Sequence, residues 1–358
     1  MDQPRASGTP ARTRMRIGAG IGIGIALILL LASLLLLRSP GRSDPPRGSG
    51  TQGTDTDLAS SATTPGGNAP GTDAASSVPD PSAPSSPPAA VSTPIGAVEG
   101  PFTIELIDTS RRLVSGGIQI DTVRRLPTRI WRPTAPGHHP LVVFAHGYQV
   151  GPMTYARFCA DLAAQGYVVA APSFPLADES RGNGLDREDI PEETGDINFI
   201  IARLRASDST ISTSISDDPV TVIGHSDGAT VALLVAGRPG SMNPVVGAVI
   251  AIAPDTVTGD LSSTPPPVLI IHGTADPIAA FSDAQGDFDR FSGSRFLLAL
   301  EGADHLAPIV GGTPWTPVID RAVRLFLAAV QAHRGPADAG SLTTELDRLD
   351  LSHVLHAG

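Results

Sequence analysis

Three short glycine-containing motifs place a serine, an aspartate and a histidine in an order that suits nucleophilic catalysis. The motifs are Gly-His-Ser-Asp-Gly at 224–228, His-Gly-Thr-Ala-Asp at 272–276 and Gly-Ala-Asp-His at 302–305. A serine hydroxyl needs a base that removes its proton, and the base needs an acid that orients its ring and stabilises its charged form. We therefore expect Ser226 to be the nucleophile, Asp276 the acid and His305 the base.

The acid has two candidates in the sequence. Asp276 follows the apolar segment 268–271, whereas Asp255 follows the preceding apolar segment, 245–253. Some hydrolases that present their residues in the order serine, acid, histidine carry the acid one strand earlier. We favour Asp276 and keep Asp255 as the alternative acid. Asp304, beside the base, is expected to serve its own loop.

Attack on a carbonyl creates a negatively charged oxygen that needs two hydrogen-bond donors. The backbone N–H of Asp227 directly follows the nucleophile and is expected to be one donor. The second is expected from the loop after the apolar segment 141–145, at the N–H of Tyr148. His225 adjoins the nucleophile, but a sharp turn directs neighbouring side chains apart, so we expect it to pack beside the turn.

Each motif follows a short apolar segment, which is the pattern of a parallel sheet buried on both faces. The apolar segments lie at 141–145, 167–171, 220–223, 245–253, 268–271 and 296–300. Helices are expected at 154–165, 196–204, 229–236 and 318–332, and strands at 102–108, 117–123 and 128–131 predict an antiparallel start. Because sites of open parallel sheets form beyond the carboxyl ends of the strands, this fold would gather the motifs at one edge.

The polar segment 176–193 lies between a predicted strand and a predicted helix and is rich in Asp, Glu, Gly and Arg. Such a segment is either an ordinary solvated loop or a rim over the site. The sequence leaves both interpretations open.

The first hundred residues contain no candidate core. Residues 17–37 are 21 positions without a charge, enough for a helix to span the roughly 30 Å hydrocarbon core of a bilayer. Arginines within 1–16 predict a cytoplasmic N-terminus and an uncleaved signal anchor in the cell membrane, with secretion after signal cleavage as the alternative. Residues 38–97, rich in Pro, Ser, Thr and Gly, predict a disordered linker. The catalytic domain would then occupy 98–334 outside the cytoplasm, followed by a C-terminal tail at 335–358.

Composition argues against several partners and chemistries. The formal net charge is −11 and the chain has no lysine, which disfavours nucleic-acid binding. Cys159 is the single cysteine, so no intramolecular disulfide can form, and we expect it to be a buried apolar residue. Histidines and aspartates lack the spacing of metal ligands, so we expect neither a metal nor an organic cofactor.

Together with His-Gly-Tyr at 146–148, the three motifs resemble those of α/β-hydrolases, and among them the dienelactone hydrolase-like proteins. Secreted actinobacterial esterases, cutinase-like polyester hydrolases, chlorophyllase-like proteins and plasma-type platelet-activating-factor acetylhydrolases are neighbours of that group. The resemblance covers about residues 100–332 and implies an α/β-hydrolase fold, with a mostly parallel central sheet and helices on both faces. The sequence departs from these groups in three places. Dienelactone hydrolases use a cysteine nucleophile, where this chain has Ser226. Polyester hydrolases usually have a tryptophan where this chain reads Ala-Pro-Asp at 253–255, and they often have a C-terminal disulfide, which a chain with one cysteine cannot form. The acetylhydrolase resemblance keeps Asp255 open as the acid.

These residues and the resemblance predict a serine esterase that acts on a small-molecule or lipid-like carboxylic ester through an acyl-enzyme. Narrower alternatives are a polyester or cutinase-like hydrolase and a phospholipid acetyl-ester hydrolase. An amidase or peptidase would use the same three residues. An alternative of a different class is a non-catalytic, surface-anchored binding module on a hydrolase scaffold, although such modules usually lose a catalytic residue.

Overall fold

The computed structural model describes residues 96–357 apart from 308, 310 and 333–335. The predicted cytoplasmic segment, transmembrane helix and linker therefore lie outside the described residues, except for positions 96 and 97. No helix in the described part of the chain has both the length and the hydropathy needed to cross a bilayer.

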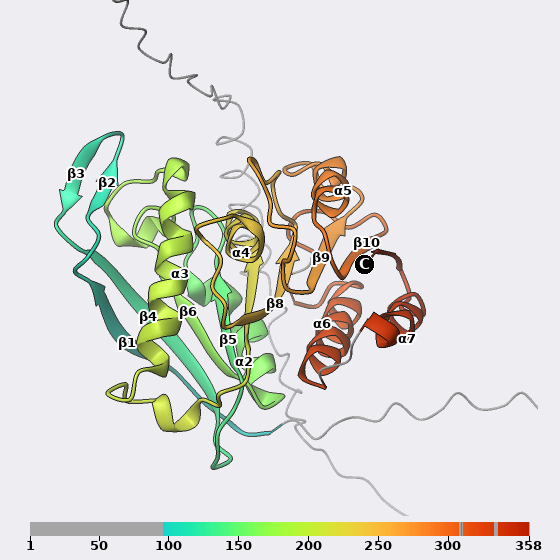
Figure 1. The fold of residues 1–358 in the computed structure, drawn as a ribbon, viewed down its shortest axis with the longest axis horizontal. Helices are drawn as coiled ribbons and strands as arrows, with labels where there is room; N and C mark the ends of the chain where they lie inside the picture. The colour runs from blue at the N-terminus through green and yellow to red at the C-terminus, as the bar shows by residue number, and fades with distance from the viewer. Residues whose placement is uncertain (1–95, 308, 310, 333–335, 358) are drawn as a thin grey trace, which may run out of the picture. The chain divides into compact units, whose positions relative to one another are not determined.

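A nine-stranded sheet runs through the described residues in the order β1-β4-β6-β5-β7-β8-β9-β10-β11 (Figure 1). Its strands are β1 (Val98–Asp108), β4 (Arg124–Pro133), β5 (Leu141–Ala145), β6 (Val168–Pro172), β7 (Val220–His225), β8 (Val246–Ile252), β9 (Val268–Gly273), β10 (Arg295–Leu300) and β11 (Ser352–Ala357). Neighbouring strands from β6 to β10 pair in parallel, whereas β1 with β4, β4 with β6 and β10 with β11 pair antiparallel. The predicted antiparallel start and mostly parallel sheet are confirmed.

The parallel strands are apolar because both of their faces are covered. Every residue of β5, β6, β7 and β9 is buried. Such strands read as continuous apolar segments rather than as alternating ones. One predicted strand differs: the segment 117–123 forms β3 (Ile118–Asp121), which pairs with β2 (Leu113–Ser115) in a separate hairpin outside the main sheet.

Helices cover both faces of the sheet and create two apolar cores. On one face lie α3 (Ile190–Arg205), α4 (Asp227–Gly237) and α5 (Phe281–Arg290). On the other lie α2 (Ala156–Ala164), α6 (Thr316–Gln331) and α7 (Pro336–Leu346). Cys159 on α2 is a free, fully buried member of the second core, and burial raises the pKa of its thiol. The thiol is therefore kept protonated and packs as a small apolar side chain.

α7 and β11, which lie within the predicted C-terminal tail, add a helix and an edge strand to the fold. Leu342 and Leu346 of α7 are buried against the core beneath α6. β11 then pairs with β10 along its whole length, from Ser352 opposite Leu300 to Ala357 opposite Arg295. β11 was not predicted, because it is short and lies at the sheet edge, where its alternate side chains stay partly exposed and the apolar signal is weak.

Candidate active site

The carboxyl ends of four strands in one sheet carry the candidate residues. β5 leads into Tyr148, β7 into Ser226, β9 into Asp276 and β10 into His305. β5, β7, β8, β9 and β10 follow one another in the sheet and run in the same direction (Figure 1). The fold therefore brings segments that are far apart in the sequence to one edge.

Ser226 occupies a strained turn between β7 and α4. Its φ of 56° and ψ of −126° put a non-glycine residue in a region that L-amino acids avoid. A Cβ on Gly224 would lie 2.0 Å from the Gly228 carbonyl oxygen, and one on Gly228 would lie 2.2 Å from the Ala145 carbonyl oxygen. The Ser226 N–H donates to the Ile252 carbonyl at 3.0 Å, which ties the turn to β8. This close packing explains the two glycines and gives the turn the geometry of a nucleophile elbow.

A continuous hydrogen-bonded chain, here called the triad, joins Asp276, His305 and Ser226. His305 Nδ1 donates to Asp276 Oδ2 at 2.7 Å, and His305 Nε2 lies 3.0 Å from Ser226 Oγ. His305 is 5% exposed, and the Asp276 side chain is fully buried. Because Nδ1 carries a hydrogen bound to the carboxylate, Nε2 of the neutral ring presents its lone pair to the hydroxyl, as a general base must.

The surroundings of Asp276 keep its carboxylate ionised. Burial raises the pKa of Asp276, but the hydrogen bond from His305 and the N–H groups of Ile278 at 2.8 Å and Ala279 at 3.0 Å outweigh burial and lower it. His272 Nε2 lies 3.9 Å from the same carboxylate and has no hydrogen-bond partner within the described residues. A charged acid stabilises the imidazolium that forms when the base takes up a proton.

Asp255 does not face the histidine. Its side chain is 47% exposed, and its carboxylate lies 3.2 Å from Arg187 and accepts the Thr256 N–H at 2.9 Å. Asp304 accepts two backbone N–H groups of the loop that follows it, as expected. The structure therefore joins Asp276, and not Asp255, to the candidate base.

Two backbone N–H groups near the nucleophile turn have no acceptor among the described residues. Neither the N–H of Tyr148 nor that of Asp227 donates to a carbonyl or side chain within the part of the chain that the structure describes. The adjoining N–H of Gln149 donates to the Ala177 carbonyl at 2.7 Å, which fixes the loop next to Tyr148. Backbone donors are nearly always paired in folded proteins, so these two can bind an oxygen of a ligand.

Part of the chain is similar to known proteins. Residues 108–277 match the family model of chlorophyllases. The chain is 28% identical to Chlorophyllase-1 of Arabidopsis thaliana over 146 residues. This aligned region covers 40% of this chain and 44% of that protein. The mostly parallel sheet and this similarity both fit an α/β-hydrolase.

The similarity to chlorophyllases covers only part of the candidate site. The matched region contains Tyr148, Ser226 and Asp276 and ends before His305. The match spans less than half the length of the curated relative. The structure, rather than the similarity, therefore gives the position of His305.

A buried relay connects two loops of the candidate site. The Tyr155 hydroxyl accepts the Gly147 N–H at 3.0 Å and lies 3.0 Å from His225 Nδ1, while His225 Nε2 lies 3.0 Å from the His305 carbonyl oxygen. A carbonyl only accepts, so Nε2 carries the ring hydrogen and Nδ1 accepts the tyrosine proton. Burial lowers the pKa of His225 to about 3, which keeps the ring neutral. His225 thus packs beside the turn, as expected, and also holds the backbone of His305.

His146 holds the Tyr148 loop from its other side. The Phe174 N–H donates to His146 Nε2 at 2.9 Å, so the ring hydrogen lies on Nδ1, which donates to the Gly147 carbonyl at 2.8 Å. Burial lowers the pKa of His146 to about 4. Two neutral histidines and one tyrosine therefore fix the loop that carries the proposed oxyanion donor.

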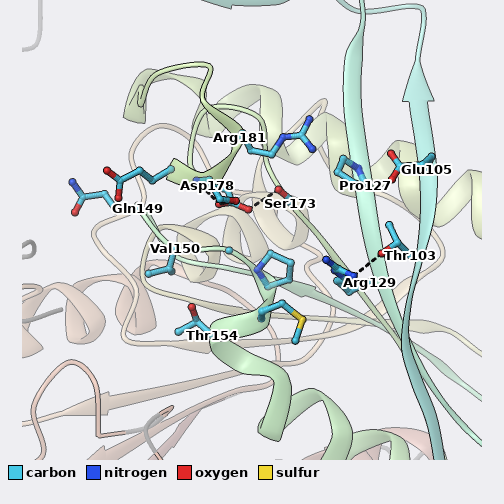
Figure 2. A pocket seen from close by; sticks show the side chains of 15 residues that line it. Thr103, Glu105, Pro127, Arg129, Gln149, Val150, Thr154, Ser173, Asp178 and Arg181 are labelled. Atoms are coloured by element: carbon cyan, nitrogen blue, oxygen red, sulfur yellow. Dashed lines mark hydrogen bonds between the residues drawn. The ribbon is translucent and has the colours of Figure 1, made fainter. Parts of the chain in front are cut away.

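A cavity of about 760 Å³ lies beside the loop 149–154 rather than at the triad (Figure 2). Arg129 and Arg181 contribute to its wall, and Asp178 is buried beneath it with its carboxylate bound to the Ser173 hydroxyl at 2.6 Å. None of the three triad residues lines it. The cavity therefore borders the segment that follows Tyr148 without containing the candidate reacting groups.

Sequence reasoning missed the residues that support the triad. Tyr155 and His146 fix the Tyr148 loop, and Arg187 binds the residue after the nucleophile. Only His146, which directly follows an apolar strand, had a sequence signal, because the contacts of the other two depend on how distant loops fold. Among the described residues, no cluster of three His, Cys, Asp or Glu side chains is arranged to hold a metal ion.

Proposed function

We propose that the protein is a serine hydrolase that cleaves carboxylic esters, with Ser226 as nucleophile, His305 as general base and Asp276 as the acid. The observation that carries the proposal is the hydrogen-bonded chain from Asp276 through His305 to Ser226, at 2.7 and 3.0 Å. A base within hydrogen-bond reach of a hydroxyl, itself oriented by a carboxylate, is what activation of a serine requires.

The chemistry follows from the positions of these groups. Ser226 Oγ bonds to the ester carbonyl carbon while its proton moves to His305 Nε2, and the N–H groups of Tyr148 and Asp227 bind the resulting oxyanion. His305 returns the proton to the leaving alcohol oxygen as the C–O bond breaks, which leaves an acyl-serine. A water molecule, deprotonated by His305, then attacks the acyl carbon, and the acid leaves as the serine hydroxyl is restored.

The substrate class we propose is a small-molecule or lipid-like ester. The similarity to a protein named as a chlorophyllase supports an ester substrate. Polyesters and phospholipid acetyl esters are narrower versions of the same proposal, and amide cleavage would use the same triad. A binding module would need neither the strained turn at Ser226 nor an imidazole lone pair aimed at the hydroxyl, which favours catalysis over that alternative.

Hydrolysis of p-nitrophenyl esters, from acetate to palmitate, tests the proposal on the full chain. We expect activity that Ser226→Ala abolishes and Ser241→Ala retains. Ser241 is a matched control, because its hydrogen bonds within the described residues use only its backbone. A fluorophosphonate probe should label the wild-type chain and not Ser226→Ala. A folded wild-type chain that stays unlabelled, or hydrolysis that survives in Ser226→Ala, would contradict the proposal.

We also propose that residues 17–37 anchor the protein in the membrane, with the catalytic domain outside the cytoplasm. The support is the uncharged stretch itself and the arginines that precede it. Esterase activity should then stay in the membrane fraction after an alkaline wash and be accessible to protease on intact cells. Activity found only in the medium would instead indicate signal cleavage and secretion.

A further inference from the structure

The segment between β6 and α3 places an arginine beside the nucleophile turn. Arg187 Nε donates to Asp227 Oδ2 at 2.7 Å, and Arg187 Nη2 donates to Asp227 Oδ1. The same guanidinium lies 3.2 Å from Asp255 Oδ2 and 5.9 Å from the centre of the Tyr148 ring. This segment is therefore a rim of the site, and Arg187 contacts both residues whose N–H groups are the proposed oxyanion donors.

Asp227 brings a buried negative charge to the place where the reaction would create another. Its side chain is 4% exposed, and it follows Ser226 directly. Burial and the Asp227 charge raise the pKa of Tyr148, whereas the Arg187 charge lowers it. Both charges therefore act on the loop that carries Tyr148. An unpaired carboxylate there would oppose the negative oxygen that the N–H groups must stabilise.

Asp189, two residues after Arg187, belongs to a buried ion-pair cluster that fixes this part of the chain. Asp189 accepts hydrogen bonds from Arg124 at 3.0 and 2.7 Å, and Arg124 also binds Asp196 of α3 at 2.7 and 2.6 Å. Arg124, on β4, is fully buried. Because Asp189 is fixed to this cluster, the Arg187 fork is oriented towards Asp227 before any substrate binds.

We propose that Arg187 is a positioning residue whose guanidinium neutralises Asp227 and so keeps the oxyanion site favourable to a negatively charged oxygen. This inference rests on the proposed ester hydrolysis and deepens it. Two of the three guanidinium nitrogens already bind Asp227, and one of these two also reaches Asp255. Arg187 therefore acts through Asp227, and the ion pair lets an acidic residue follow the nucleophile without raising the barrier of the reaction.

Replacing Arg187 by methionine removes the charge and keeps an apolar stem. We expect kcat for p-nitrophenyl acetate to fall about 100-fold with little change in KM, because the unpaired Asp227 charge acts on the transition state rather than on bound substrate. Arg187→Lys keeps the charge without the two-point fork and should lose less. Arg181→Met is the matched control, since Arg181 lies in the same segment and donates to the Arg125 carbonyl instead, and it should retain activity.

The deciding measurement is the effect of Arg187→Met in an Asp227→Asn background. Asparagine keeps the size of the side chain and removes its charge, so the same change should then lower kcat by less than about 3-fold. A loss of about 100-fold in both backgrounds would overturn the proposal, because it would mean that Arg187 acts on the substrate or on the fold. Thermal unfolding checks each variant, and Arg187→Gln provides the same comparison should Arg187→Met not fold.

The two proposals fail in different ways. A wild-type chain without esterase activity that depends on Ser226 would refute the proposed function. An active wild-type chain whose Arg187→Met loss is not reduced by Asp227→Asn would refute the role of Arg187 alone.

Discussion

Replacing Tyr155 by phenylalanine removes the single hydroxyl that joins the Tyr148 loop to the histidine loop. That hydroxyl accepts the Gly147 N–H and donates to His225 Nδ1, each at 3.0 Å. Tyr155 is 1% exposed and His225 is 2% exposed, so water does not readily replace the lost partner. Tyr155→Phe therefore leaves a buried donor and a buried acceptor unpaired.

The expected loss of stability follows from these two groups. A buried polar group without a partner costs about 1–3 kcal/mol, so the free energy of unfolding should fall by roughly 3 kcal/mol after partial relaxation. We expect kcat to fall by about 10-fold, because small displacements of catalytic groups are costly, while the hydrogen bond from His225 to the His305 carbonyl remains.

Urea denaturation of the wild-type chain, Tyr155→Phe and Tyr167→Phe measures the effect. Tyr167 is 7% exposed, but its hydroxyl makes no hydrogen bond within the described residues, so its removal should change the free energy of unfolding by less than about 0.5 kcal/mol. A Tyr155→Phe loss as small as that of Tyr167→Phe would refute the relay, because the two substitutions remove the same atom from buried rings.

Three further predictions follow from the contacts of the site and the sheet. Asp276→Asn should lower kcat for a p-nitrophenyl ester by about 10⁴-fold and Asp255→Asn by less than about 3-fold, and the reverse order would make Asp255 the acid. Because burial lowers the pKa of His146 to about 4 and of His225 to about 3, the unfolded chain takes up protons first as the pH falls from about 6.5. These two histidines therefore lower the free energy of unfolding as the pH falls from about 6.5 to 4, whereas Asp189 and Glu193, whose pKa values burial raises, increase it. Burial raises the pKa of Asp287 to about 7, so this carboxyl also increases the free energy of unfolding as the pH falls. In urea titrations between about pH 6.5 and 4, Asp287→Asn should therefore lose stability towards acid relative to the wild-type chain, and the same pH dependence in both would contradict the assignment. Ending the chain before α7 removes two buried leucines and exposes the β10 edge. The free energy of unfolding should then fall by at least about 4 kcal/mol. A shortened chain as stable as the full chain would show that this segment is dispensable for folding.

The sheet was predictable because its central strands carry their own signal. Each buried parallel strand is a continuous apolar segment, and the candidate residues follow those strands within a few positions, as Ser226 follows β7 and His305 follows β10. A residue placed by the end of a strand can therefore be found from local sequence. β11 had no such signal, because an edge strand of six residues with alternate exposure resembles a loop.

The supporting contacts could not be predicted for a different reason. Arg187 and Asp227 are 40 positions apart, and Tyr155 and His225 are 70 apart. Whether such pairs meet depends on the path of irregular segments, which no periodic pattern specifies. The sequence indicated that the segment 176–193 could be a rim of the site, but the residue that makes it one is visible only from its contacts.

The two candidate acids illustrate how the path of a loop decides a role. Asp255 and Asp276 follow the neighbouring strands β8 and β9, so strand position alone cannot separate them. The loop after β9 buries Asp276 against His305, whereas the loop after β8 leaves Asp255 half exposed beside Arg187. An exposed carboxylate is screened by solvent and contributes little to its ion pair, so the buried Asp227 is the stronger partner of that guanidinium. Asp255 is thus outside the triad, and its carboxylate contacts Arg187 instead of the candidate base.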